Sequence, residues 1–191
     1  MSLAAQPKGD AFQKTATSLA GLLILRPRVF GDARGFFLES YNERALADLG
    51  IRESFVQDNH SCSRRNVLRG LHYQIQQPQG KLVRVIEGEI LDVAVDLRRS
   101  SPTFGGWEGV RLSGENQRML WIPQGFAHGF CVISDKAHVL YKATEYYAPG
   151  FERTLAWNDS DLKINWELDG EPIISPKDQR GVAFRDAETF A

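Results

Sequence analysis

Two of the four histidines lie in segments crowded with polar and aromatic side chains, where proton transfer is the natural chemistry. His72 lies in the run RGLHYQ, and His128 ends the run PQGFAH. A histidine has an unperturbed pKa of roughly 6.5, so its neutral imidazole accepts a proton near neutral pH. A carboxylate that holds the second ring nitrogen would fix the tautomer and stabilise the imidazolium. These features predict general acid–base chemistry centred on His72.

The spacing around these histidines resembles the two cupin motifs but departs from their metal-binding form. A metal-binding cupin has two histidines one residue apart, a carboxylate a few residues later, and a third histidine in the pattern P-x-G-x-x-H. His128 fits that last pattern, whereas Gln74 stands where the second histidine of the first motif would be. Residues 73–81 contain no Asp or Glu, and Lys81 adds a positive charge. Because transition metals need several imidazole or carboxylate ligands together, we expect no metal here.

Three other side chains would complete a proton-transfer set. Asp178, in the run SPKD, is a candidate to hold the second nitrogen of His72. Tyr141 would return a proton from another direction, and Lys81 would stabilise an oxyanion formed when a proton leaves carbon beside a carbonyl. Each has a structural alternative: Tyr141 as a core aromatic, Lys81 as a solvated turn residue, and Asp178 as a surface charge.

The elements that position these residues are expected to be short strands. Residues 91–97 alternate apolar and polar side chains, the period-two pattern of a half-buried strand. The apolar run 82–86 precedes them, and Glu87-Gly88-Glu89 predicts a turn that makes the pair a hairpin. Further elements are expected as strands at 118–122, 132–133 and 138–147, and as one helix capped by Asn42 and stopped by Gly50. Many short strands and few short helices predict an all-β, cupin-like jelly-roll β-barrel.

Length and composition bound the organisation and the partners. With 191 residues the chain fits one domain, expected at 21–191 after a flexible N-terminal tail at 1–20. The formal net charge of -1 argues against nucleic acid as a partner. No apolar run reaches the roughly 18 residues of a membrane helix, and the start lacks a signal-peptide pattern, so no membrane association and a cytoplasmic location are expected. Cys62 and Cys131 are then expected to be free thiols.

Nine motifs together make a resemblance to one family specific. In chain order they are FGDARGFFLESY, FVQDNHS, NVLRGLHYQ, GKLVRV, GEILDVAVDLR, SPTFG, WIPQGFAHGF, LYKATEYYAP and SPKD. From about residue 23 to residue 184, the chain resembles the dTDP-4-dehydrorhamnose 3,5-epimerase family, the cupin enzymes of dTDP-L-rhamnose synthesis.

The resemblance implies a role for each matching residue. His72 matches the family's proton acceptor, Asp178 its dyad partner and Tyr141 its proton donor, and Lys81 matches the lysine near the sugar oxygen. The residues that match positions holding the nucleotide sugar are Arg34, Glu39, Arg69, His128, Glu152 and Lys177, with Tyr147 as the aromatic that stacks on thymine. Gln57, Asp58 and Asn59 match a binding strand that, in the family, is lent by the other subunit of a homodimer.

The implied reaction is the epimerisation of dTDP-4-dehydro-6-deoxy-D-glucose at C3 and C5. Both carbons flank the C4 ketone, which acidifies their protons, and inversion needs a base and an acid on opposite sides. No net oxidation occurs and the chain lacks a G-x-G-x-x-G loop, so no cofactor is expected. Three alternatives remain: a monofunctional 3- or 5-epimerase of a related keto sugar, a non-catalytic cupin that binds a sugar nucleotide, and a metal-dependent cupin enzyme.

Overall fold

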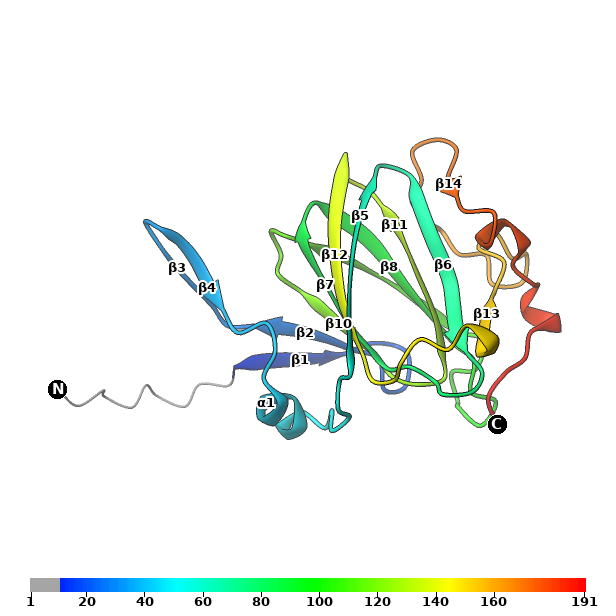
Figure 1. Cartoon of the computed structure of the whole chain (residues 1–191), viewed down its shortest axis with the longest axis horizontal. Coiled ribbons are helices and arrows are strands. Elements are labelled where there is room, and N and C mark those ends of the chain that lie inside the picture. The colour runs from blue at the N-terminus through cyan, green and yellow to red at the C-terminus, as the bar shows by residue number, and fades with distance from the viewer. Residues whose placement is uncertain (1–10) are drawn as a thin grey trace.

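The computed structural model describes residues 11–191, and strands form most of that part of the chain (Figure 1). One sheet, the β7 sheet, has the order β1-β2-β10-β7-β12-β5. Its strands are β1 (Phe12–Ala16), β2 (Leu23–Pro27), β10 (Met119–Ile122), β7 (Lys81–Glu87), β12 (Lys136–Ala143) and β5 (Gln57–Arg64). The second, the β8 sheet, has the order β13-β6-β11-β8-β9, with β14 paired to β6. Its strands are β13 (Glu152–Thr154), β6 (Val67–Gln74), β11 (Phe126–Val132), β8 (Glu89–Asp96), β9 (Trp107–Ser113) and β14 (Ile173–Ile174).

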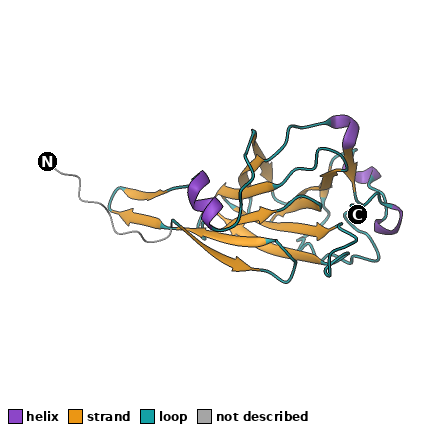
Figure 2. Ribbon diagram, turned by 90° about the horizontal axis from the view of Figure 1, so that it is seen from below, coloured by secondary structure: helices purple, strands orange, loops and turns teal. Residues whose placement is uncertain are grey.

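Helical segments are few and short, which confirms the expected all-β class (Figure 2). They are α1 (Glu43–Asp48) and the 3-10 turns η1 (Pro149–Phe151), η2 (Asp178–Arg180) and η3 (Phe184–Asp186). Helix α1 begins as expected, because Asn42 accepts a hydrogen bond from the Ala45 N–H at 3.1 Å. Gly50 follows its end with a φ of +96°, which favours glycine. In residues 11–191 no helix has the length and apolar character needed to cross a bilayer.

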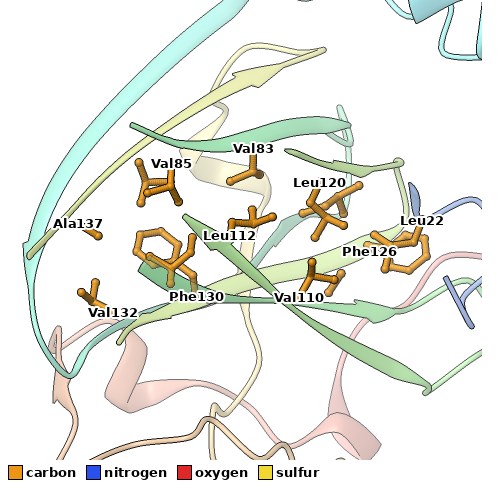
Figure 3. Packing of buried hydrophobic residues seen from close by; sticks show 14 of the residues in the cluster. Leu22, Val83, Val85, Val110, Leu112, Leu120, Phe126, Phe130, Val132 and Ala137 are labelled. Atoms are coloured by element: carbon orange, nitrogen blue, oxygen red, sulfur yellow. The ribbon is translucent and has the colours of Figure 1, made fainter. Parts of the chain in front are cut away.

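The main core fills the space between the two sheets (Figure 3). Side chains from both sheets meet there, among them Val83, Val85, Leu120, Val110, Leu112 and Phe130. Burying each such side chain contributes about 1.5–3 kcal/mol, so this layer holds the sheets face to face. A cavity between the sheets can therefore lie only where these packed apolar side chains end.

The outer face of the β8 sheet is also covered. Leu91, Val93 and Val95 of β8 pack in a second apolar cluster with Leu155 and Trp166 of the C-terminal segment. The expectation of a half-buried strand is therefore wrong, since every residue from Ile90 to Asp96 is buried. Alternation marks the two faces of a strand, but it does not reveal that a later segment covers the second face.

The expected hairpin of β7 and β8 is also wrong, although both strands exist. Strand β7 pairs with β10 and β12, whereas β8 pairs with β9 and β11 in the other sheet. Gly88 makes this crossing between sheets with a φ of +81°. A Cβ atom there would lie 2.0 Å from the Lys136 carbonyl oxygen, so the close approach requires glycine.

The N-terminal region is more structured than the expected tail over 1–20. Strand β1 pairs with β2 in antiparallel register from Phe12↔Pro27 to Ala16↔Leu23. Phe12 is 2% exposed, within a third apolar cluster beneath α1 that includes Leu46 and Trp121. The rest of the expected tail, residues 1–10, lies outside the described residues.

A two-stranded arm, β3 (Val29–Asp32) with β4 (Gly35–Leu38), projects away from the sandwich (Figure 1). Its aromatic side chains are open to solvent in the single chain, with Phe36 61% and Phe37 67% exposed. Exposed apolar side chains gathered on one element mark an interaction surface.

A buried carboxylate, Asp96, ties the end of β8 to the loop that follows. It accepts hydrogen bonds from Arg98 at 2.8–3.0 Å, from Ser101 at 2.6 Å and from Thr103 at 2.7 Å. Burial alone would raise the pKa of Asp96, but these hydrogen bonds outweigh it and lower the pKa to about 2.

We expect Asp96→Asn to lower the free energy of unfolding by about 3 kcal/mol at pH 7, because it leaves Arg98 without its buried counter-charge. The folded pKa lies below the unfolded value of roughly 3.9, so the contribution of Asp96 is present above pH 4 and is lost as pH falls towards 2. Urea denaturation of both proteins from pH 7 to pH 2.5 measures this. The matched control is Asp135→Asn, which breaks an exposed pair with Arg65 and should cost less than about 1 kcal/mol. Equal losses in the two variants would contradict the expectation.

Candidate active site

A cavity of about 620 Å³ lies where the apolar core between the sheets gives way to polar side chains. The residues lining it come from both sheets and from the C-terminal segment, and they include His72, Lys81, His128, Tyr141, Glu152 and Asp178. The four residues expected to be catalytic therefore share one cavity.

His72, on β6, is held by a buried carboxylate from the far end of the chain. Its Nε2 lies 2.6 Å from Oδ1 of Asp178, whose side chain is 3% exposed. Burial raises the pKa of Asp178, but the hydrogen bond and charge of His72, with help from Gly70 N–H and Ser175, bring it below its ordinary value. Asp178 is thus an ionised partner for the imidazole, not a surface charge.

His128, on β11, lies directly opposite His72 in the antiparallel pairing of β6 and β11. Its Nε2 lies 2.9 Å from Oδ1 of Asp92, a fully buried residue of β8. Burial lowers the pKa of His128 despite the opposing effect of Asp92, which favours a neutral imidazole. Asp92 was not predicted as a site residue from the sequence. An aspartate inside the apolar run ILDVAV nevertheless indicates a buried carboxylate that needs a partner.

Lys81, the first residue of β7, is 8% exposed and faces the same cavity. Burial lowers its pKa to about 8, against the opposing effects of the carboxylates of Asp92 and Glu152. At neutral pH the ammonium is therefore charged but poorly solvated, which strengthens its interaction with an anion in the cavity.

Tyr141 reaches the cavity from the other side. It lies on β12 of the β7 sheet, whereas His72 lies on β6 of the β8 sheet. Burial raises the pKa of Tyr141, and nearby Glu152 adds to the rise while Arg69 opposes it. Its hydroxyl is protonated at neutral pH and available as a donor.

Tyr147, Glu152 and Lys177 form a connected group at the cavity wall. Tyr147 donates its hydroxyl proton to Glu152 at 2.9 Å, and Lys177 Nζ lies 2.6 Å from the other carboxylate oxygen. Burial raises the pKa of Glu152, but Lys177 and Tyr147 outweigh it and lower the pKa below its ordinary value. The aromatic ring of Tyr147 is left half-exposed beside the cavity.

Strand β5 contributes alternate residues to the cavity of its own chain. Gln57 and Asn59 line a pocket together with His72, Lys81 and Tyr141. The expectation that a second subunit lends these two residues is therefore wrong. Among the described residues, Asn59 Nδ2 is the buried side-chain nitrogen or oxygen left without a hydrogen-bond partner.

Asp58 lies between these two residues and points to the opposite face of the sheet. Its carboxylate accepts from Lys142 Nζ at 2.9 Å, outside the cavity. Its assignment as a substrate-binding residue is not supported within the chain, because strand alternation directs it away.

Arg69 lines the cavity beside His72, with its Nε donating to Ser63 at 3.1 Å. A strict alternation along β6 would put Arg69 and His72, three positions apart, on opposite faces. The pairing of β6 with β11 shifts register between His128 and Phe130, and this irregularity brings both side chains to one side.

Arg34 and Glu39 are not brought to the cavity of their own chain. Arg34 is in the β3–β4 arm, pairs with Asp32 and has a 90% exposed side chain. Glu39 follows the arm and accepts from Asn42. Across residues 11–191, no group of three or more His, Cys, Asp or Glu side chains is arranged to hold a metal ion.

The two facing sheets, with the P-x-G-x-x-H histidine opposite His72, define a cupin-type jelly roll whose cavity is equipped for acid–base chemistry. The model of the dTDP-4-dehydrorhamnose 3,5-epimerase family matches residues 16–186. The chain belongs to this family.

Individual relatives agree with this membership. The chain is 59% identical over 177 residues to the dTDP-4-dehydrorhamnose 3,5-epimerase of Pseudomonas aeruginosa, covering 92% of this chain and 98% of the relative. A dTDP-6-deoxy-D-glucose-3,5-epimerase from Legionella pneumophila, solved with dTDP-4-keto-L-rhamnose, superposes with a TM-score of 0.91 at 49% identity, covering 93% and 95% of the two chains. A 3'-monoepimerase from Streptomyces bikiniensis, solved with dTDP-quinovose, gives a TM-score of 0.83 at 31% identity, covering 88% and 86%.

We expect the Lys81 ammonium to titrate near pH 8, as followed by NMR of its side-chain carbon and nitrogen signals. Asp92→Asn should move this titration to lower pH, because it removes a negative charge that favours the ammonium while the burial remains. A midpoint near the free value of roughly 10.4 would contradict the assignment, as would an unchanged midpoint in the variant.

Proposed function

We propose that this chain inverts both C3 and C5 of dTDP-4-dehydro-6-deoxy-D-glucose, giving dTDP-4-dehydro-L-rhamnose. The observation that carries the proposal is the placement of an aspartate-held imidazole and a protonated tyrosine on opposing sheets around one cavity. A ring bound between them has a base on one side and an acid on the other.

The base is His72, through the ring nitrogen that Asp178 does not hold. Asp178 bonds to Nε2, so the tautomer protonated on Nε2 leaves the lone pair of Nδ1 free. Nδ1 takes the proton from a carbon beside the ketone, and the electron pair moves onto O4 as the enolate forms. Asp178 stabilises the imidazolium that results.

Lys81 supplies the positive charge for that enolate oxygen. A buried ammonium interacts with a developing anion more strongly than a solvated one does. Tyr141 then donates its proton to the opposite face of the carbon, which completes the inversion and restores the ketone. His72 then releases the proton it took to solvent, and Tyr141 takes one up from solvent.

The nucleotide end of the substrate is assigned to the part of the cavity that Arg69, Tyr147 and Lys177 line. Arg69 and Lys177 give it positive charge that suits a diphosphate. Tyr147 offers a half-exposed ring for stacking on thymine, while Glu152 and Asn59 supply an acceptor and a free donor. His128 presents an imidazole between these groups and His72.

Arg34 and Glu39 reach a cavity in this proposal through a homodimer. The β3–β4 arm projects from its own sandwich and exposes Phe36 and Phe37, which a second copy would cover. The arm would thereby carry Arg34 to the partner's cavity, where its guanidinium adds a forked donor for phosphate.

The cytoplasm is the proposed compartment. Its support is the pair of free cysteines, Cys62 and Cys131, which suits a reducing environment.

Incubation with dTDP-4-dehydro-6-deoxy-D-glucose in deuterium oxide, followed by NMR, tests the reaction. We expect deuterium at both C3 and C5. His72→Ala should abolish exchange at both carbons, because no base remains. Tyr141→Phe should keep part of the exchange but lower the rate of completed inversion by about 100-fold or more, because proton removal survives without the opposing acid.

A monofunctional epimerase is the second candidate, favoured by the resemblance to a 3'-monoepimerase structure. Exchange at one carbon alone would establish it. Absence of exchange at either carbon would refute both candidates, and full activity in His72→Ala would refute the assignment of the base.

Mixing two impaired variants tests whether the arm of one subunit completes the cavity of the other. Arg34→Ala damages the arm and His72→Ala the cavity, so we expect both homodimers to be impaired. After subunit exchange, half of the dimers would pair one of each and contain one intact site, restoring about a quarter of the activity. No recovery, with mixed dimers verified by mass spectrometry, would show that the arm does not act across the dimer.

A further inference from the structure

Gln74, at the end of β6, is 3% exposed and uses its whole amide on backbone groups. Its Nε2 donates to the carbonyl oxygens of Gln77 at 2.7 Å and Tyr146 at 3.2 Å. Its Oε1 accepts from the Ala148 N–H at 2.9 Å. One side chain therefore fixes two loops, one on each side of Lys81 in sequence.

The residue enclosed by these contacts is Tyr147. Gln74 holds the carbonyl of Tyr146 and the N–H of Ala148, and Gln57 of β5 accepts the N–H of Tyr147 itself at 2.9 Å. Three consecutive residues are thus held by two glutamines. The hydroxyl of Tyr147 then reaches Glu152, which lies opposite Gln74 in the pairing of β13 with β6.

We infer that Gln74 is a positioning residue for nucleotide binding: it fixes residues 146–148 so that the ring of Tyr147 faces the cavity. This rests on the proposed role of Tyr147 in binding the dTDP end of the substrate. Gln74 acts through Tyr147 and need not touch the substrate.

The sequence position of Gln74 supports a specific demand for an amide. It occupies the place of the second histidine in the first cupin motif. A neutral imidazole has one donor and one acceptor, whereas a primary amide has two donors and an acceptor. Only the amide can bind two carbonyls and one N–H together, which is what this site requires.

Gln74→Met tests the inference, because methionine keeps the unbranched shape and removes the polar contacts. We expect KM, and the Kd for dTDP measured by calorimetry, to rise together by about tenfold or more, with kcat changed less than about threefold. In hydrogen-exchange measurements, the amides of Tyr147 and Ala148 should lose protection.

The matched control is Asp159→Asn. Asp159 is also a buried loop clamp, with oxygens that accept from the N–H groups of Asp161, Leu162 and Phe184, and it does not line the cavity. This variant should lower the Tm while leaving KM and the dTDP Kd within about twofold. If it raised KM as much as Gln74→Met does, loss of stability would explain both, and the inference would fail.

Other outcomes are equally decisive. A fall in kcat with unchanged KM and dTDP Kd, or unchanged protection at residues 146–148, would overturn the positioning role. If the wild-type protein bound dTDP but catalysed no exchange in deuterium oxide, the proposed epimerisation would fail, while the dTDP Kd and the amide protection would still decide the role of Gln74.

Discussion

The contact between His72 and Asp178 depends on where the C-terminal segment lies, because the two residues are 106 positions apart in the chain. A carboxylate as buried as Asp178 must have partners, and His72, Gly70 and Ser175 provide them. The segment is carried there by apolar packing: Leu155 and Trp166 bury themselves on the outer face of the β8 sheet, and β14 pairs with β6. The hydrophobic packing of the C-terminal segment on the β8 sheet therefore fixes where Asp178 lies relative to His72.

The same sandwich architecture places His72 and Tyr141 on different sheets around one cavity. A histidine and a tyrosine on neighbouring strands of one sheet would approach a bound ring from the same side. Here β6 and β12 belong to different sheets, so the gap between the sheets becomes the space for the ring. The apolar core stops short of the polar end, and Phe130 belongs to the core and also lines the cavity. Rigid packing there keeps the two groups apart at a fixed separation.

Local sequence motifs predicted the cavity residues well, since His72, Lys81, Tyr141 and Asp178 each lie in a distinctive run. Local motifs could not predict which strands belong to the same sheet. The runs at 82–86 and 91–97 look like a hairpin, yet Gly88 sends them to opposite sheets. Nor do side-chain types reveal the register shift in the pairing of β6 with β11, which brings Arg69 and His72 to one side. Arg34 shows the remaining limit: its motif predicted a substrate-binding residue, yet in the single chain it pairs with Asp32 in solvent, away from the cavity.

In the proposed reaction an enolate forms at O4, and Lys81 is the buried cation that would stabilise it. Burial lowers the pKa of Lys81 to about 8, and the nearby carboxylates of Asp92 and Glu152 oppose the fall. Asp92 also holds His128, so a single fully buried carboxylate both orients an imidazole and favours the charged form of Lys81. Had the carboxylate been solvated, its field would be screened and its effect on the Lys81 ammonium would be weaker. The position of Asp92 inside an apolar strand therefore helps, together with Glu152, to keep the Lys81 ammonium charged at neutral pH.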